Sequence, residues 1–286
     1  MLVDLASVSL RIVSFVALFQ ASGAAIFVAL FGKSLAQSLP RIRHVGLVSA
    51  FVALASVGGH YALEAARMAG DFTGVMDASL QTLVMRGSSG AMAGARLAGV
   101  LLIALGLAGD RDWRNLVALL GTLFVLVSFT LVGHTAVHPD RPILAALLIA
   151  HLFGGAFWFG ALAPLYLVSS HEPMRIAGRV LNAFSSLALW LVPGLMLAGV
   201  LIATFLIPSL EVFKSSYGIL LIGKAVGFSL LMLLASANKW RFAPAINHGE
   251  ARAITLLQRS LIAEYVLIVA VLGITAVMTE FFAPDS

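Results

Sequence analysis

The sequence has no cysteine, and charged residues are scarce. Of the 286 residues, 11% are Asp, Glu, Lys or Arg, whereas 60% are hydrophobic. The absence of Cys excludes disulfides, thiolate metal sites, cysteine nucleophiles and thiolate-ligated iron–sulfur clusters. Soluble globular chains contain about 25% charged and about 45–50% apolar residues. A soluble protein of this size would leave much apolar surface in water, so the composition indicates an integral membrane protein.

Eight apolar stretches are long enough to cross a bilayer as helices, since a crossing needs about 20 residues. They lie near 7–31, 45–66, 91–108, 114–133, 143–168, 181–206, 217–237 and 256–281. We therefore predict an all-α, polytopic transmembrane helical bundle with eight spans. We expect it to form a single transmembrane domain over residues 1–286, with a short interfacial helix in the connection at 67–90.

The basic residues indicate how the bundle lies in the membrane. Eleven Lys and Arg belong to the connections after spans 1, 3, 5 and 7: Lys33, Arg41, Arg43, Arg111, Arg114, Arg175, Arg179, Lys239, Arg241, Arg252 and Arg259. The other side has five: Arg67, Arg86, Arg96, Arg141 and Lys214. Because basic residues concentrate on the cytoplasmic side, we predict a multi-pass membrane protein with both termini on the outer side.

The sequence offers no motif of a soluble enzyme or a nucleotide-binding protein. The stretch Gly218–Lys224 has the spacing of a phosphate-binding loop, but Ala225 replaces the Ser or Thr that would hold Mg²⁺, and the stretch lies inside a span. The net charge of +5 is explained by the positive-inside distribution. We therefore expect the lipid bilayer as a partner, no nucleic acid, no nucleotide and no enzymatic activity.

Four of the seven histidines map to the outer half of the predicted bundle, and these are His60, His134, His138 and His151. An imidazole inside a span needs a polar or metallic partner, which makes these four the candidate metal ligands. For His151, a hydrogen bond to a backbone carbonyl is the alternative. Glu64 follows His60 by four residues on the same helix face and is a candidate to orient its ring.

Methionine shows the same asymmetry, with Met68, Met76, Met85 and Met92 all between spans 2 and 3. Thioether and imidazole without thiolate form a ligand set suited to Cu(I). These four are additional candidate ligands, although Met also fills gaps in apolar packing. The sequence therefore favours a copper site on the outer side, with packing as the alternative role of each Met.

Two further charges, Lys224 and Glu264, lie inside the last two spans. A charge in lipid faces the bundle and finds a partner. We expect the two residues to lie at similar depth and to form a buried ion pair. The alternative is a proton-coupling or ion-coupling element.

The second half of the chain resembles the CopD copper-resistance membrane proteins. The resemblance rests first on the stretch His151-Leu-Phe-Gly-Gly-Ala-Phe-Trp158-Phe-Gly160, with the pair Gly133-His134 before it. It rests also on Tyr217-Gly218, Lys224, Ala237-Asn238 and Pro244, which follow in that order. The last feature is Glu264, in a span that ends at Phe282-Ala283-Pro284. This resemblance covers about residues 130–286. The resemblance gives His134, His151, Trp158, Lys224 and Glu264 family interest by position. It also implies a bacterial inner membrane, so that both outer termini would be periplasmic, and a small periplasmic copper-binding partner of the CopC type.

Two functions follow as hypotheses. The first is copper ion transport, as import from the periplasm in copper homeostasis and resistance, with copper captured by the outer histidines. The alternative is membrane electron transfer through haem b, held by two histidines such as His134 or His60 with His151.

Overall fold

The computed structural model describes residues 2–109, 111–207, 209–247 and 250–282, so Ala283 and Pro284 lie outside the described residues. Within these ranges the chain is helical and has no strands, and eight helices are long and apolar enough to cross a membrane. They are α1 (Leu2–Phe31), α2 (Leu39–Ala69), α4 (Ser88–Leu107), α5 (Asp112–Ser128), α7 (Arg141–His171), α8 (Met174–Leu206), α9 (Ser216–Ala237) and α11 (Ala251–Phe281). The prediction of an eight-span helical bundle is confirmed.

Shorter elements connect these helices. They are the 3₁₀ turns η1 (Gly32–Ser34), η2 (Phe72–Met76), η3 (Phe129–Leu131) and η4 (Leu210–Lys214), the helices α3 (Ala78–Arg86), α6 (His134–Val137) and α10 (Ala243–Asn247), and the π-helical turn η5 (Asn238–Phe242). The predicted short helix between spans 2 and 3 is α3. It begins where the Asp77 carboxylate accepts the backbone N–H groups of Ser79 and Leu80.

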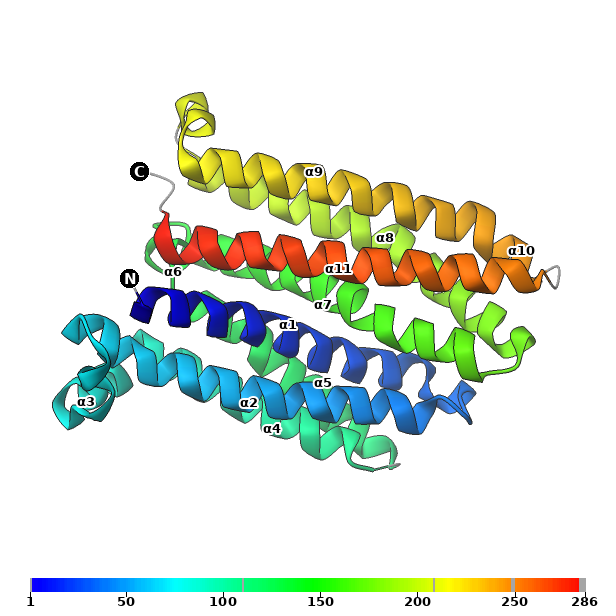
Figure 1. The fold of residues 1–286 in the computed structure, drawn as a ribbon, viewed down its shortest axis with the longest axis horizontal. Helices are drawn as coiled ribbons and strands as arrows, with labels where there is room; N and C mark the ends of the chain where they lie inside the picture. Colours follow the sequence, from blue (N-terminus) through cyan, green and yellow to red (C-terminus); the bar gives the residue numbers. More distant parts are fainter. Residues whose placement is uncertain (1, 110, 208, 248–249, 283–286) are drawn as a thin grey trace.

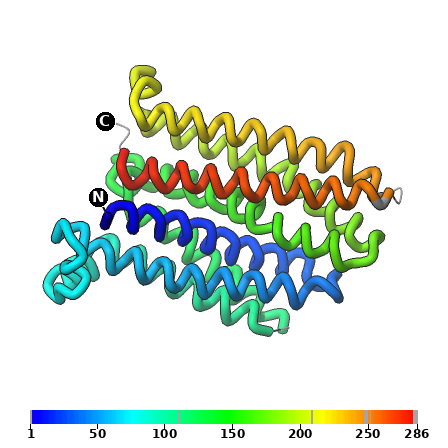
Figure 2. The backbone as a smooth tube through the Cα atoms, in the orientation of Figure 1, coloured from blue at the N-terminus to red at the C-terminus, as the bar shows by residue number. Residues whose placement is uncertain are grey.

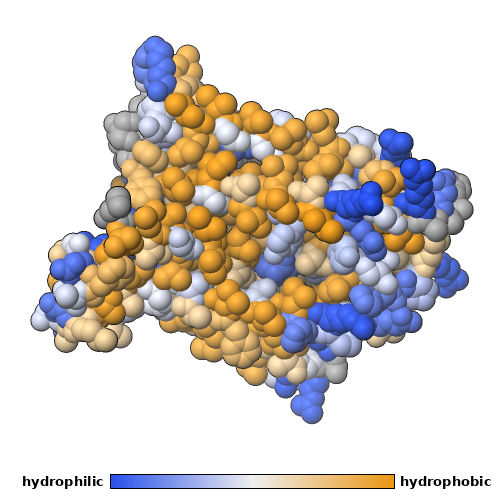
Figure 3. Space-filling model, viewed as in Figure 1, coloured by the Kyte–Doolittle hydropathy of each residue, from blue (hydrophilic) through white to orange (hydrophobic). Residues whose placement is uncertain are grey.

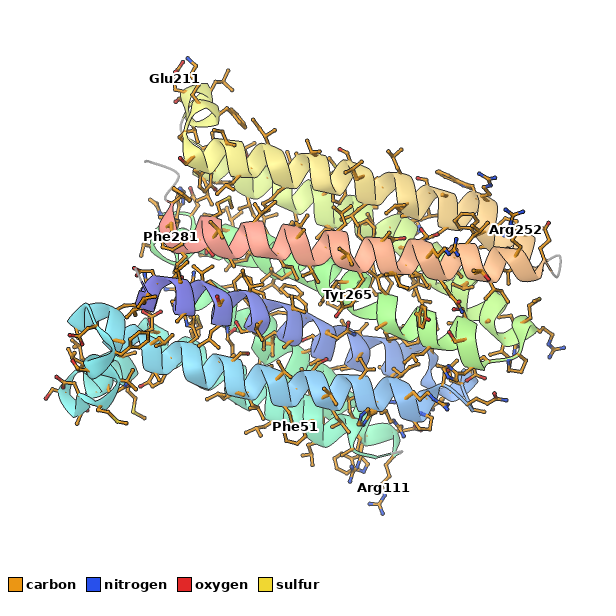
Figure 4. The ribbon with its side chains drawn as sticks, viewed as in Figure 1. Phe51, Arg111, Glu211, Arg252, Tyr265 and Phe281 are labelled. Atoms are coloured by element: carbon orange, nitrogen blue, oxygen red, sulfur yellow. The ribbon has the colours of Figure 1, made fainter. Side chains whose placement is uncertain are left out.

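The start of α1 and the end of α11 lie at the same end of the bundle, which we call the terminal end (Figure 1). The connections containing α3, α6 and η4 lie there as well. The opposite end carries the eleven basic residues counted above, and we call it the basic end. Arg111 and Arg252 lie at the basic end, whereas Glu211 lies at the terminal end (Figure 4). The apolar surface runs between the two ends, as a membrane-embedded belt requires (Figure 3).

Helix α1 is the central helix of the bundle, packing against α2, α5, α7 and α11 (Figure 2). Its most apolar stretch is 78% buried within the protein, against 17% for α8 and for α9. A glycine pair allows this close packing. A Cβ atom added to Gly23 would lie 2.2 Å from the carbonyl oxygen of Ala156 and 2.3 Å from the Cα of Gly160. Only residues without side chains permit α1 and α7 to cross here.

The second half of the chain is packed more loosely than the first. Helix α8 packs on α7, and α9 packs on α11. The consecutive helices α8 and α9 do not pack closely on each other over the described residues. A cavity of about 130 Å³ lies beside them, towards the basic end. This loose packing leaves polar residues of α9 and α11 next to open space.

Candidate metal and ion site

A polar cluster joins α1, α2 and α11 at the terminal end. The carboxylate of Glu280, which has no exposed side-chain surface, lies 2.7 Å from the Arg11 guanidinium and 2.9 Å from that of Arg67. The Ser7 hydroxyl donates to the same carboxylate at 2.7 Å. Ser7 and Arg11 lie on one face of α1, since they are four residues apart. The cluster therefore joins residues at the start and end of the chain.

His60 of α2 belongs to this cluster and is 5% exposed. Arg11 Nε donates to its Nε2 at 3.3 Å, and the Ser7 hydroxyl lies 3.4 Å from the same nitrogen. On the other side of the ring, Nδ1 lies 3.8 Å from Glu64 Oε1. The predicted placement of Glu64 beside His60 is therefore observed. The Nε2 lone pair, however, is already occupied by an arginine donor.

A small cavity beside His60 is lined by three of the candidate site residues predicted from the sequence. His60, Glu64 and Met92 line it together with Arg96, and its volume of about 10 Å³ holds about one water molecule. The Arg96 guanidinium is buried over the Phe129 ring, and its Nε donates to Ser128. Met92 therefore lines the same cavity as the His60 imidazole.

The charges around this cavity do not favour a bare cation. The cluster and the cavity lining together contain three guanidinium groups, of Arg11, Arg67 and Arg96, but two carboxylates, of Glu64 and Glu280. Hydrogen bonds and ion pairs hold these charged groups in place. Among the described residues there is no group of three or more His, Asp or Glu side chains placed to hold a metal ion.

The structure does not gather the other three outer histidines around His60. His134 is exposed at the start of α6, and His138 follows that helix. The Nδ1 of His138 accepts the backbone N–H of Asp140 at 3.0 Å, and its ring lies edge-on to Phe205 of α8. His151 lies ten residues into α7 and faces α8. His138 and His151 contact α8 at residues ten positions apart, so the structure does not bring the four candidates into one group.

His151 has one ring nitrogen available for a ligand. Its Nδ1 lies 2.9 Å from the carbonyl oxygen of Leu195, and because a carbonyl only accepts, Nδ1 is the donor. The alternative expected from the sequence, a bond to a backbone carbonyl, is thus present, and it leaves the lone pair of Nε2 free. Gly199 makes room for the ring, since a Cβ there would lie 2.9 Å from His151 Cε1. Lys224 of α9 lies near enough for an electrostatic interaction with His151.

The predicted ion pair between Lys224 and Glu264 is wrong. Glu264, which is 1% exposed, accepts from the Trp158 indole N–H at 3.1 Å and from the side-chain amide of Asn238. From the terminal end, Lys224 lies eight residues into α9, and Glu264 lies 17 residues before the end of α11. At 1.5 Å per residue these depths are about 12 Å and about 25 Å. The two charges lie at different depths, so they do not pair.

The outer methionines separate into two kinds. Met68, Met76 and Met85 are 54%, 89% and 71% exposed, whereas Met92 is 8% exposed. The exposed three do not fill gaps in the protein core. Met68 lies in the last turn of α2, and Met76 and Met85 lie on the connection between α2 and α4, at the terminal end.

Sequence reasoning missed the arginine cluster and the role of Asn238. Arg11 and Arg96 fall within apolar stretches, and a charged residue in such a stretch is a signal for a functional or structural polar site. Asn238 was noted only as part of the family resemblance, and its contact with Glu264 was not predictable because it arises from the tertiary fold.

Neither of the two cavities described above suits haem. The first has a single imidazole and room for about one water molecule, and the second has no histidine in its lining. The structure therefore offers no bis-histidine pocket at either place.

Comparisons with known proteins match both halves of the chain to one family. Residues 1–141 match the family described as copper resistance protein D-like, N-terminal domain, and residues 178–278 match copper resistance protein D. The resemblance expected for the second half thus extends to the first. A copper resistance protein D from Pseudomonas syringae pv. tomato is 34% identical over 141 residues, which are 45% of this chain and 46% of that relative. The match therefore spans about half of the relative. No solved structure matches the chain.

Proposed function

Since the chain belongs to the copper resistance protein D family, we propose that it imports copper from the periplasm across a bacterial inner membrane. In this proposal the terminal end faces the periplasm and the basic end faces the cytoplasm. The single observation that carries the proposal is the free Nε2 of His151, an imidazole donor suited to copper within the terminal half of the bundle.

We assign capture of copper to the residues nearest the periplasm. His134 is exposed, and His138 packs against the α8 helix that also contacts His151. These three imidazoles form a sequence of donors from the surface into the bundle, and imidazole is a ligand for copper in either oxidation state. His60, with Glu64 and Met92, is a weaker candidate for copper capture, because one arginine donates to its Nε2 and another lines its cavity.

Delivery of copper to this face is proposed to involve a periplasmic copper-binding protein of the CopC type. The exposed thioethers of Met68, Met76 and Met85 lie at the terminal end and suit transfer of Cu(I) between proteins. Replacing all three with Leu is expected to slow transfer from such a donor while leaving the affinity for free copper unchanged.

The test is Cu(I) binding to the purified full chain in detergent micelles, measured for single variants. His151→Ala is expected to lower copper affinity most, His134→Ala next and His60→Ala least. His44→Ala, at the basic end, is the matched control and is expected to bind like the unmodified chain. Thermal melting of each variant verifies folding.

Uptake in cells tests the direction of transport. Cells expressing the unmodified chain are expected to accumulate more copper than cells expressing His151→Ala. If His134→Ala and His151→Ala both bind copper like the unmodified chain, the assignment of the capture site is wrong.

A further inference from the structure

Glu264 is a buried carboxyl group that the capture site does not use. Its side chain is 1% exposed, and its two oxygens accept hydrogen bonds from neutral donors, the Trp158 indole N–H and the Asn238 side-chain amide. No Lys or Arg among the described residues forms an ion pair with it. The three residues come from α11, α7 and η5, so their hydrogen bonds join the helix that carries His151 to the last two spans.

An unpaired negative charge is unfavourable at this position. Moving a carboxylate from water into apolar surroundings costs far more free energy than hydrogen bonds from two neutral donors return, and such a group becomes neutral by binding a proton. Glu280 is the contrast, because its carboxylate is also buried but pairs with the guanidinium groups of Arg11 and Arg67. The surroundings therefore favour a proton on Glu264 and a negative charge on Glu280.

Asn238 can form a hydrogen bond with either form of this carboxyl group. Its amide nitrogen donates to Glu264 Oε1, which suits an ionised oxygen, while its Oδ1 is buried without any hydrogen-bond partner. Rotating the amide by half a turn presents Oδ1 to the same oxygen, where it accepts the O–H of a protonated carboxyl group. Asn238 also opens a π-helical turn, and such turns are frequent at functional sites. The pair therefore retains a hydrogen bond in both protonation states.

The cavity beside α8 and α9 gives this pair a path for protons towards the basic end. Its volume of about 130 Å³ has room for several water molecules, and Glu264 and Asn238 line it together with Lys239 and Trp240. Trp240 is 70% exposed, so the cavity reaches the surface of the protein. Because Trp side chains concentrate at membrane–water interfaces, this opening lies where water is close.

Ser260 adds a polar group one helical turn closer to the basic end. Helix α11 begins at that end, and Ser260 precedes Glu264 by four residues on the same helix face. Its hydroxyl oxygen is buried and has no hydrogen-bond partner. A hydroxyl group both donates and accepts, so Ser260 suits the transfer of a proton to or from the carboxyl group.

Lys239 is the other titratable side chain in the lining of this cavity. It is partly exposed and forms no ion pair with Glu264, and its neighbour Arg241 in η5 is exposed. The charged and histidine side chains on the helices packed against α11 lie at other depths, and these are Lys224 of α9, Arg141, His151 and His171 of α7, and Asp4 and Arg11 of α1. Glu264 is therefore the group of this region whose charge a proton has to remove.

We propose that Glu264 is a proton-binding site, which exchanges its proton with the cytoplasmic side through the cavity and couples that exchange to copper transport. The inference rests on the proposed import function and adds a second ion to it. In the exchange, the O–H bond of the carboxyl group breaks, the proton passes to a water molecule in the cavity, and the carboxylate keeps the electron pair. Trp158 and His151 are seven residues apart on one face of α7, so a change in the hydrogen bonds of Glu264 acts on the helix that holds the capture residue.

Labelling with dicyclohexylcarbodiimide tests whether Glu264 is protonated. The reagent is soluble in lipid and reacts with protonated carboxyl groups, because the acid adds across one C=N bond and the adduct rearranges to a stable N-acylurea. With the purified full chain in detergent micelles at neutral pH, mass spectrometry of peptides is expected to locate the label on Glu264, and labelling is expected to fall as the pH is raised. Glu280 is the matched control in the same chain, since it is also buried but ion-paired, and is expected to stay unlabelled.

Infrared spectroscopy makes the test independent of access by the reagent. The unmodified chain is expected to show the C=O stretch of a protonated carboxyl group, which shifts in D₂O and is missing from Glu264→Gln. The control Glu211→Gln, at an exposed residue, is expected to leave this band unchanged. Thermal melting verifies folding, and Glu264→Asp, which keeps the carboxyl group and should shift the band, replaces Glu264→Gln if that variant does not fold. If the variant lacks a carboxylate signal instead of this band, Glu264 is ionised and the proton site is overturned.

Uptake of Cu(I) into proteoliposomes tests the coupling and separates it from the import proposal. For the unmodified chain, uptake is expected to change with the pH on the side of the basic end. Glu264→Gln, which is fixed in a neutral form, is expected to lose this dependence while its copper affinity at the capture site stays unchanged. If Glu264→Gln keeps the pH dependence, the coupling is overturned while import stands. If the unmodified chain takes up no copper, import fails and the coupling falls with it, whereas labelling and infrared spectra still decide whether Glu264 binds a proton.

Discussion

Glu280 is expected to hold the last helix against the first two, and Glu280→Gln tests this. The carboxylate accepts the Ser7 hydroxyl and pairs with Arg11 and Arg67, and its side chain has no exposed surface. Removing one partner of a buried ion pair costs about 3–5 kcal/mol, because the other charge remains buried without compensation.

Partial exposure of the arginines reduces this cost. The side chains of Arg11 and Arg67 are 19% and 30% exposed, so water partly solvates them when Glu280 is neutral. Arg67 also retains Glu64 at 3.6 Å. We therefore expect the free energy of unfolding to fall by about 3 kcal/mol, at the lower limit for a buried pair.

Glu211→Gln is the matched control for this prediction. Glu211 also pairs with a basic residue, Lys214, at 2.8 Å, but both side chains are more than 75% exposed, at 76% and 77%. Its loss is expected to cost about 0.5 kcal/mol or less. Unfolding by SDS in mixed micelles and thermal melting measure both variants. If Glu280→Gln is no less stable than Glu211→Gln, the cluster does not fasten α11 to α1 and α2.

Three further predictions concern stability. Burial raises the pKa of Glu172, but hydrogen bonds from two backbone N–H groups and a hydroxyl outweigh it and lower the pKa below its ordinary 4.5. Since the folded pKa lies below the unfolded value, the stabilisation is complete above pH 4.5 and is lost as the pH falls. The melting temperature of Glu172→Gln should lack this acid dependence. Lys224→Met and Glu264→Gln should destabilise additively within about 0.5 kcal/mol, and a larger interaction in a double-mutant cycle would restore their pairing. Gly23→Ala forces α1 and α7 apart and should lower the free energy of unfolding by about 1–3 kcal/mol. Gly94→Ala, whose added Cβ meets nothing within 4 Å, should leave it unchanged. Equal melting temperatures of the two variants would contradict the close crossing.

The arginine-rich cluster and the histidine route have different chemistry at the same end of the bundle. The cluster joins residues from three helices by ion pairs and leaves no unoccupied nitrogen on the His60 ring facing Arg11. His151 on α7, in contrast, offers a free imidazole nitrogen. We therefore interpret the cluster as the group that holds α1, α2 and α11 together, and His151 remains the residue of the proposed capture site.

The sequence by itself determined the number of membrane-spanning helices and the end at which basic residues gather. Both properties depend on local composition, because a run of about 20 apolar residues forms a helix in lipid whatever its neighbours are. The proximity of Glu64 to His60 was predictable for the same reason, since it needs only the helical repeat.

The tertiary structure decided which charged and polar side chains meet. Depth along separate helices depends on where each helix begins and how it tilts, and the sequence did not show that Lys224 and Glu264 differ by about 13 Å along the bundle. Glu264 instead meets Trp158 and Asn238 from two other elements. Such contacts depend on the rotation and register of packed helices, which are set by close crossings such as that of Gly23 with Gly160.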